Sequence, residues 1–293
     1  MQPTRTTRWK RQRIWKCVRW LALLLLLCVI LRWFEHSQVY FPEKRFIAEG
    51  GALSRPFEDI YLKARDGVRL NGWFFPAKTN STRAHLVILL FHGNAGNISH
   101  RLDHFDTLLE TGVNLFALDY HGYGRSAGKP GEAETYLDAL AAHGWLVQRG
   151  FAPASIIALG ESLGGGVASE LALGEPLGGL ILQSTYTSIP DIGAELFPWL
   201  PVRLLATIKY DTQSKLPRIQ VPVLIMHSRD DTMIRFRHAE KNFAAANDPK
   251  MIWELQGDHN DALESNRTRY LEGMEKFLNL IETRAQTNRV RAD

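Results

Sequence analysis

The stretch that decides the fold is Ile156-Ile157-Ala158-Leu159-Gly160-Glu161-Ser162-Leu163-Gly164-Gly165-Gly166-Val167. An apolar, β-prone run ends at Gly160, a single serine lies between two glycines, and a run of small residues typical of a tightly packed helix follows. A Gly-x-Ser-x-Gly pattern between a strand and a helix predicts a sharp turn that exposes the serine hydroxyl at the end of a sheet. Ser162 is therefore the first candidate nucleophile of the chain.

The glycines around Ser162 have a steric explanation. A residue on so tight a turn takes a strained backbone conformation, and its close neighbours must lack bulk, as Gly160, Gly164 and Gly165 do. The backbone amide of Leu163, at the start of the following helix, is placed to stabilise negative charge on a reacting oxygen. A glycine-rich loop without catalytic function is the alternative interpretation, because so short a pattern also occurs by chance.

A serine hydroxyl is a weak nucleophile at neutral pH, so it needs a base and a group that orients the base. The apolar strand at 223–227 is followed by a loop with Asp230 and Asp231, and the loop after the last expected strand contains His259. Asp231 is the preferred acid and Asp230 the alternative, although either aspartate could accept backbone N–H bonds in a turn. Ser162, Asp231 and His259 thus follow the chain order of α/β hydrolases, each at a strand end.

A second group for charge stabilisation follows the strand that ends at Phe91. The segment His92-Gly93-Asn94-Ala95-Gly96-Asn97 is placed to offer the backbone amide of Asn94 as the second oxyanion donor, beside that of Leu163. Glycine-rich loops also bind phosphates, but this one has neither Gly-x-Gly-x-x-Gly nor a following Gly-Lys-Ser/Thr, so nucleotide binding is not predicted. The predicted chemistry requires neither a metal nor an organic cofactor.

Short apolar strands alternate with helical patterns through the body of the chain. Two strands at 57–63 and 68–75, joined by Ala-Arg-Asp-Gly, predict an antiparallel opening. Further strands are expected at 86–91, 114–118, 156–160, 180–183, 223–227 and 251–255, with helices at 98–110, 132–148, 163 onward, 236–246 and 262–284. This order predicts an α/β fold, a mostly parallel, doubly wound sheet with helices on both faces.

Charge and cysteine content exclude several classes of protein. Eight of the 35 Lys and Arg residues lie before Phe34, where there is no acidic residue, so 27 remain against 31 acidic residues, a formal charge of −4. A body with this charge does not indicate nucleic-acid binding. The two cysteines, Cys17 and Cys28, lie in or beside the apolar amino-terminal run, which leaves the body without a disulfide or a cysteine-based metal site. We expect Cys17 to be buried and inert; lipidation is the alternative.

The sequence of the amino terminus predicts a membrane anchor. Residues 21–31 are continuously apolar, and the run extends over 18–34 if the flanking arginines reach the lipid head groups and the flanking tryptophans anchor at the interface. A cleaved signal peptide and a helix lying in the interface are the alternatives. The bulky residues that follow the run, Arg32 to His36, argue against cleavage, so we predict an uncleaved signal anchor.

Basic residues set the expected orientation and the segment boundaries. Seven Lys and Arg residues precede the apolar run and only three follow it closely, which places the amino terminus in the cytoplasm and the body on the outer or periplasmic side. The expected segments are a basic tail at 1–17, the anchor at 18–34, a juxtamembrane linker at 35–56, the hydrolase domain at 57–285 and a flexible tail at 286–293.

An apolar, proline-punctuated insertion is expected at about 184–220, within the domain. Its large apolar residues are Leu196, Phe197, Trp199, Leu200, Leu204 and Leu205. The simpler interpretation is a helix packed on the sheet, and the other is a wall of an acyl-binding site close to the bilayer.

With these residues identified, the chain from about Val39 to Leu280 resembles the α/β-hydrolase superfamily. It is most similar to the membrane-anchored serine hydrolases near the prolyl-peptidase-like hydrolases and protein depalmitoylases. The motifs that carry the resemblance are Asn71-Gly72-Trp73-Phe74-Phe75-Pro76, Phe91-His92-Gly93-Asn94-Ala95-Gly96-Asn97, Leu118-Asp119-Tyr120-His121-Gly122-Tyr123-Gly124-Arg125-Ser126, Gly160-Glu161-Ser162-Leu163-Gly164-Gly165 and Gly257-Asp258-His259-Asn260-Asp261. The sequence departs from the family pattern at Glu161, where relatives often carry Arg or His, and at Ser228, where they often carry Gly.

The resemblance implies a function and a role for each site residue. Ser162 would be the nucleophile, Asp231 the orienting acid, His259 the base, and the amides of Asn94 and Leu163 the oxyanion donors. The implied activity is hydrolysis of a small acyl ester, a thioester or a lipidic substrate. The alternatives are a serine peptidase or amidase of the same fold and a membrane-tethered binding protein without catalysis. Ser162 argues against the aspartate nucleophile that dehalogenases and epoxide hydrolases of the superfamily use.

Overall fold

A computed structural model describes residues 5–261 and 263–292 of the chain, which divides into two units, Met1–Tyr40 and Phe41–Asp293. The first unit contains one helix, α1 (Arg5–Val39), and its segment Arg13–Val39 is long and apolar enough to cross a membrane. Cys17 and Cys28 are both exposed on this helix. The expectation that Cys17 is buried is therefore wrong, because within the described residues of this unit α1 is the single element and nothing covers the side chain.

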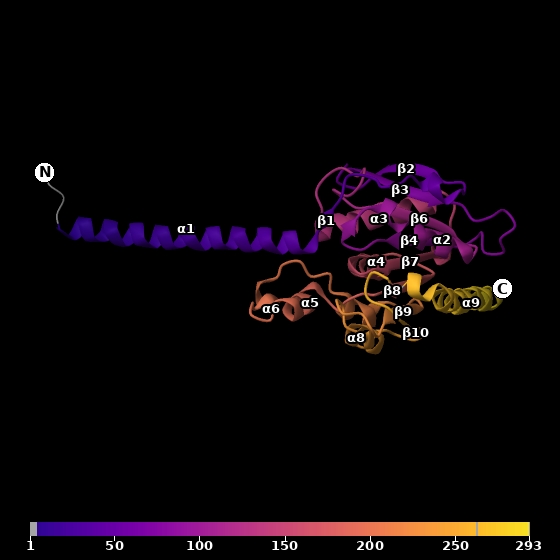
Figure 1. Cartoon of the computed structure of the whole chain (residues 1–293). Helices are drawn as coiled ribbons and strands as arrows, with labels where there is room; N and C mark the ends of the chain where they lie inside the picture. The colour runs from indigo at the N-terminus through magenta and orange to yellow at the C-terminus, as the bar shows by residue number, and fades with distance from the viewer. Residues whose placement is uncertain (1–4, 262, 293) are drawn as a thin grey trace. The chain divides into compact units, whose positions relative to one another are not determined.

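The second unit is built on an eight-stranded sheet with the order β10-β9-β8-β7-β4-β6-β3-β2 (Figure 1). Only β3 pairs antiparallel with its neighbours, β2 and β6, and the other pairs are parallel. The strands are β2 (Glu58–Lys63), β3 (Arg69–Phe75), β4 (Val87–Phe91), β6 (Asn114–Asp119), β7 (Ile156–Glu161), β8 (Gly179–Gln183), β9 (Val223–Ser228) and β10 (Lys250–Leu255). The predicted fold class, a mostly parallel doubly wound sheet with an antiparallel opening, is confirmed.

Helices cover both faces of this sheet, as the alternation along β3 shows. Phe75 belongs to a core cluster and contacts Phe105 of α2, whereas its neighbour Phe74 points to the other face and contacts Trp145 of α3. The helix α9 joins α2 on the first face through Phe277. The helices of this unit are α2 (Leu102–Glu110), α3 (Glu132–Gln148), α4 (Leu163–Gly174), α5 (Ile189–Leu196), α6 (Val202–Leu205), α7 (Thr212–Lys215), α8 (Arg237–Ala245) and α9 (Arg267–Ala292).

The structure adds detail at the ends of the expected helices. The helix expected at 98–110 begins as a 3-10 turn, Ile98–Arg101, before α2. The last helix begins at Arg267 after another 3-10 turn, and it continues to Ala292, where the sequence had indicated a flexible tail from residue 286. The expected start of this helix at residue 262 lies outside the described residues.

One feature of the second unit has no counterpart in the expected elements. A two-stranded parallel sheet joins β1 (Phe41–Pro42) to β5 (Ala95–Gly96), within segments expected to be a linker and a loop. The expected insertion at about 184–220 forms three short helices, α5, α6 and α7, and it leaves three of its large apolar side chains exposed. These are Leu196, Trp199 and Leu204.

Candidate active site

Ser162 lies in the turn that joins β7 to α4. Its φ of 52° is in the left-handed region, which non-glycine residues rarely adopt, so the backbone is strained at this residue. Its amide donates to Gln183 O of β8 over 2.9 Å, which fixes the turn against the sheet. The glycines are required, because a Cβ atom on Gly160 would lie 2.2 Å from Gly164 O, and one on Gly164 would lie 2.0 Å from Phe91 O.

The imidazole of His259 lies between the serine and an aspartate. Its Nε2 atom is 3.3 Å from Ser162 Oγ, and its Nδ1 atom is 2.7 Å from Oδ2 of Asp231. The three residues come from the loops after β7, β9 and β10, so the parallel sheet brings them together at the carboxyl ends of its strands. This geometry lets one ring accept a proton from the hydroxyl while the carboxylate fixes its orientation.

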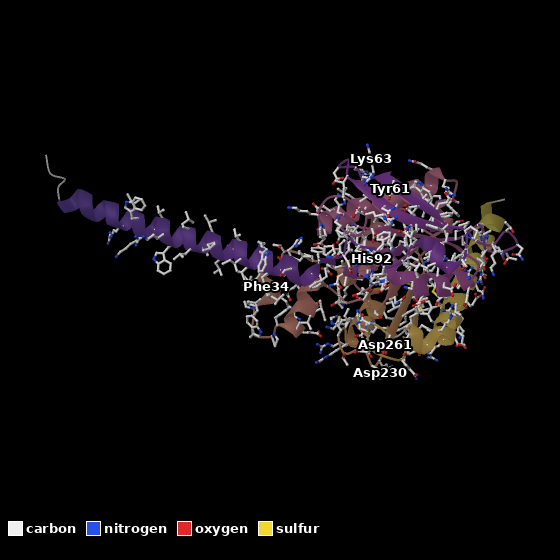
Figure 2. All side chains as sticks on the ribbon, turned by 45° about the horizontal axis from the view of Figure 1, so that its top comes forward. Phe34, Tyr61, Lys63, His92, Asp230 and Asp261 are labelled. Carbon is white, nitrogen blue, oxygen red and sulfur yellow. The ribbon has the colours of Figure 1, made fainter. Side chains whose placement is uncertain are left out.

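The structure brings Asp231 to His259, and not Asp230. The carboxylate of Asp231 is buried, and its Oδ1 accepts hydrogen bonds from the amides of Met233 (3.0 Å) and Ile234 (2.7 Å). Asp230 is exposed at the surface of the second unit (Figure 2), and its amide donates to Ser228 Oγ over 3.0 Å. Asp231 thus has both of the predicted roles. Its Oδ1 accepts backbone N–H bonds within the turn, and its Oδ2 faces His259.

Several groups hold Asp231 in its charged form. Burial acts to raise the pKa of this carboxyl, but hydrogen bonds from His227, His259 and the amide of Ile234 outweigh it, so the pKa lies well below its usual range. The acid is therefore ionised at neutral pH, as a group that orients a histidine must be.

The sequence does not indicate a role at the site for two residues of this region, His227 and Asp258. His227, at the end of β9, is fully buried, and its Nε2 atom lies 2.6 Å from Ile234 O and 3.3 Å from Asp231 Oδ2. Asp258 accepts hydrogen bonds from the amides of His259 and Thr232, each over 2.8 Å, and these bonds lower its pKa. Asp258 therefore joins the loop of the base to the loop of the acid.

The loop 92–97 lies directly against Ser162. A Cβ atom on Gly93 would be 3.6 Å from Cβ of Ser162, so the backbone passes beside the nucleophile. Two buried tyrosines hold the loop: Tyr120 donates to His92 O over 2.8 Å and Tyr123 donates to Asn94 O over 2.7 Å. Figure 2 shows the labelled His92 among the side chains of this unit, and it is fully buried.

The two expected oxyanion donors belong to different segments next to Ser162. Leu163 follows Ser162 and is the first residue of α4, so its amide is among those that have no acceptor within the helix. Asn94 follows Gly93 in the loop that touches Ser162. The N-terminus of α4 favours negative charge beside Leu163, and the role of both amides as oxyanion donors stays a prediction.

A polar network around Glu161, the residue before the nucleophile, connects the turn to neighbouring segments. Glu161 Oε2 lies 3.3 Å from Arg101 Nε and 3.6 Å from His104 Nδ1, and Arg101 also donates to Ala95 O over 3.2 Å. Burial acts to raise the pKa of Glu161, but the Arg101 charge and the histidines nearby lower it well below its usual range. Through Arg101, Glu161 thus links the nucleophile turn to the loop 92–97.

Among the residues that the structure describes, no three or more His, Cys, Asp or Glu side chains are grouped so that they could hold a metal ion.

Comparisons with known proteins agree with this fold. Residues 82–213 match a family model described as serine aminopeptidase, S33. Over 272 residues the chain is 32% identical to the uncharacterized protein Rv2307c of Mycobacterium tuberculosis. This alignment covers 92% of this chain and 96% of the relative. It is 34% identical over 238 residues to the alpha/beta hydrolase domain-containing protein WAV2 of Arabidopsis thaliana, with 73% and 76% covered.

Among solved structures, an esterase of Pyrococcus furiosus superposes with a TM-score of 0.66 at 20% identity, covering 82% of this chain and 98% of that chain. At this identity the likeness shows the shared fold. With the sequence relatives, the superposition and the strand order in agreement, the chain belongs to the α/β hydrolases.

Proposed function

We propose that the protein is a membrane-anchored serine hydrolase that cleaves carboxylic ester or thioester bonds through an acyl-enzyme. The observation that carries the proposal is the position of the His259 ring, 2.7 Å from the Asp231 carboxylate and 3.3 Å from the Ser162 hydroxyl. A histidine with a structural role alone does not account for a ring placed between a strained serine and a buried, ionised carboxylate.

In the proposed reaction, Ser162 Oγ attacks the acyl carbonyl and His259 Nε2 takes its proton. The amides of Asn94 and Leu163 receive the negative charge that forms on the carbonyl oxygen. As the tetrahedral intermediate collapses, His259 gives the proton to the leaving alcohol or thiol, and an acyl-serine remains. Water then attacks this ester with His259 again as base, which releases the acid and restores the serine.

The amino-terminal helix supplies the membrane part of the proposal. The segment Arg13–Val39 of α1 is long and apolar enough to span, and basic residues are concentrated ahead of the apolar run. We assign it as an uncleaved signal anchor with the amino terminus in the cytoplasm and the hydrolase unit on the outer or periplasmic side. The proposed domain, from residue 57 to 285, would then act at the outer surface of that membrane.

A covalent probe tests the nucleophile. A fluorophosphonate should label the wild-type protein, and Ser162→Ala and His259→Ala should each abolish labelling and p-nitrophenyl ester hydrolysis. Ser184→Ala is the matched control, because Ser184 also has a positive φ at the end of a strand and lacks a histidine partner among the hydrogen bonds of the described residues. Normal ester turnover by folded Ser162→Ala would refute the proposal.

The family match to a serine aminopeptidase favours one second candidate, a peptidase or amidase that uses the same residues. Comparing p-nitrophenyl esters with aminoacyl p-nitroanilides of the same acyl group decides between them. A higher kcat/KM for the anilides would replace the esterase assignment by the amidase one.

A further inference from the structure

The residues that follow α1 are hydrogen-bonded to the loop 92–97, which lies beside Ser162. Strand β1 pairs in parallel with β5, so that Phe41 N donates to Asn94 O over 3.0 Å and Glu43 N donates to Gly96 O over 3.1 Å. The peptide carbonyl of Asn94, the proposed oxyanion donor, is thus held by the second residue after the end of the helix.

Further hydrogen bonds continue this contact along residues 41–47. The side-chain amide of Asn97 donates to Glu43 O over 3.0 Å and to Arg45 O over 2.8 Å, and Ile47 N donates to Ser99 Oγ over 2.9 Å. Asn97 is fully buried, and its two bonds are partly buried. Residues 41–47 are therefore the outer wall of the loop 92–97.

The length of the connecting chain limits how far this loop can lie from a membrane that holds α1. From Phe34, the end of the predicted span, to Val39 the chain is helical, which gives a rise of about 8 Å. Two more residues, each at most about 3.6 Å, reach Phe41. Whatever direction the helix takes, Asn94 then lies within roughly 20 Å of the hydrocarbon, and the head-group layer itself is about 5–8 Å thick.

Exposed apolar side chains lie on segments at the same edge of the sheet. Phe41 and Ile47 flank the loop 92–97, and Met233 follows the proposed acid by two residues. Trp199 and Leu204, which are 74% and 83% exposed, lie on the insertion that leaves the carboxyl end of β8.

The insertion is tied to the region of the acid loop. Glu195 of α5 pairs with Arg237 and with His238 (3.2 Å) at the start of α8, the helix that follows the loop of Asp231. Large apolar groups gathered on one edge of a protein, and left open to solvent, indicate a surface that contacts another apolar phase. We call the side chains of Phe41, Ile47, Leu196, Trp199, Leu204 and Met233 the apolar rim.

We propose that the apolar rim docks on the lipid surface in which α1 is anchored, and that the substrate is an acyl lipid of that membrane. The ester carbonyls of acyl lipids lie at the boundary between head groups and hydrocarbon. Because the connection from α1 is short, it keeps Ser162 close enough to the membrane to reach carbonyls at this boundary. The rim would enter the interface as amphipathic surfaces do, with its apolar side chains below the head groups. This inference rests on the proposed hydrolase activity and on α1 as the anchor.

The docking is tested on the full chain in phosphatidylcholine vesicles. With Cys17 and Cys28 changed to serine, a single cysteine at position 204 or 47 carries an NBD fluorophore, and a lipid-borne nitroxide is the quencher. Val147→Cys is the matched control, because this exposed valine lies in the last turn of α3, which leads to the amino end of β7 at the opposite edge of the sheet. Quenching at 204 and 47 should exceed that at 147 at least twofold. Equal quenching at the three positions would overturn the docking.

The substrate class is tested by activity on two esters. The double variant Trp199→Ser/Leu204→Ser should hydrolyse a fluorogenic acyl lipid in vesicles about tenfold more slowly, while its rate on p-nitrophenyl acetate stays within twofold of wild type. An equal loss on both esters, or no loss on the lipid, would refute the lipid substrate. If wild type hydrolyses neither ester, the proposed function fails, and the quenching measurement still decides the docking by itself.

Discussion

His227 Nε2 lies 3.3 Å from Oδ2 of Asp231, the same oxygen that faces His259 at 2.7 Å. One carboxylate oxygen is therefore shared between the proposed catalytic histidine and a second histidine that is fully buried in β9. Because His227 Nε2 also lies 2.6 Å from Ile234 O, that nitrogen carries the proton and donates toward both oxygens. The second histidine thus helps to fix the position of the acid.

Replacing His227 by Phe should lower kcat about tenfold or more and leave KM within about twofold. The variant loses a hydrogen bond to a charged group, which is worth ~1.5–3 kcal/mol, while the buried ring does not meet the substrate. His227→Gln, which keeps an N–H donor, should recover part of kcat. Steady-state kinetics on a p-nitrophenyl ester check this, and an unchanged kcat in a folded His227→Phe protein would contradict it.

Asp231 should also make stability depend on pH. Its pKa is lower in the folded protein than in the unfolded chain, so its charged form stabilises the fold above the unfolded pKa of about 3.9, and this contribution is lost as the pH falls further. The difference in Tm between wild type and Asp231→Asn should be constant above about pH 5 and should shrink below about pH 4. Thermal unfolding from pH 2.5 to 7 measures it, and a gap that widens in acid would disprove the assignment.

The Arg101–Glu161 pair should act as one unit. Removing the guanidinium leaves a largely buried carboxylate without its counter-charge and frees the carbonyl of Ala95, so Arg101→Met should lower both Tm and kcat. Adding Glu161→Gln should restore part of both, which a double-mutant cycle measures.

Arg125→Met is the matched control for this cycle. Arg125 pairs with Glu49 and Asp59 at the surface, where such pairs contribute only ~0–1 kcal/mol. Strict additivity of Arg101→Met and Glu161→Gln would show that the two side chains are not coupled.

Two glycine substitutions should have opposite effects on stability. A methyl on Gly164 would lie 2.0 Å from the backbone oxygen of Phe91, so Gly164→Ala should destabilise the protein by at least about 1–3 kcal/mol. Gly144, inside α3, has no atom within 4 Å of such a methyl, and Gly144→Ala should stabilise by about 0.5–1 kcal/mol. Urea unfolding gives both values, and a neutral Gly164→Ala would show that the turn can relax.

Much of the fold, and the meeting of three residues at the candidate site, could be predicted because their signals are local. Ser162, Asp231 and His259 each follow a recognisable apolar strand, and parallel strands bring their carboxyl ends to one edge. The choice of Asp231 over Asp230 had only the adjoining residues to support it, and the structure gives a reason: its side chain is the one that turns inward to His259.

The missing parts depend on contacts between segments that are distant in sequence. Strand β1 has two residues, too few to show any periodicity, and its partner β5 lies in a loop. His227 sits in an apolar strand, where a histidine looks like an ordinary core residue. Glu161 and Arg101 are sixty positions apart, so only the folded chain reveals that they meet.

The pairing of β1 with β5 also determines what proteolytic shedding would do to this protein. A cut before Phe41 would detach the second unit with its loop 92–97 still supported. A cut a few residues later would remove the partners of Asn94, Gly96 and Asn97, so the released fragment would lack these hydrogen bonds to the loop 92–97. Under the proposed function and anchoring, the position of a cut within this short segment would therefore decide whether a released fragment keeps the support of the loop beside Ser162.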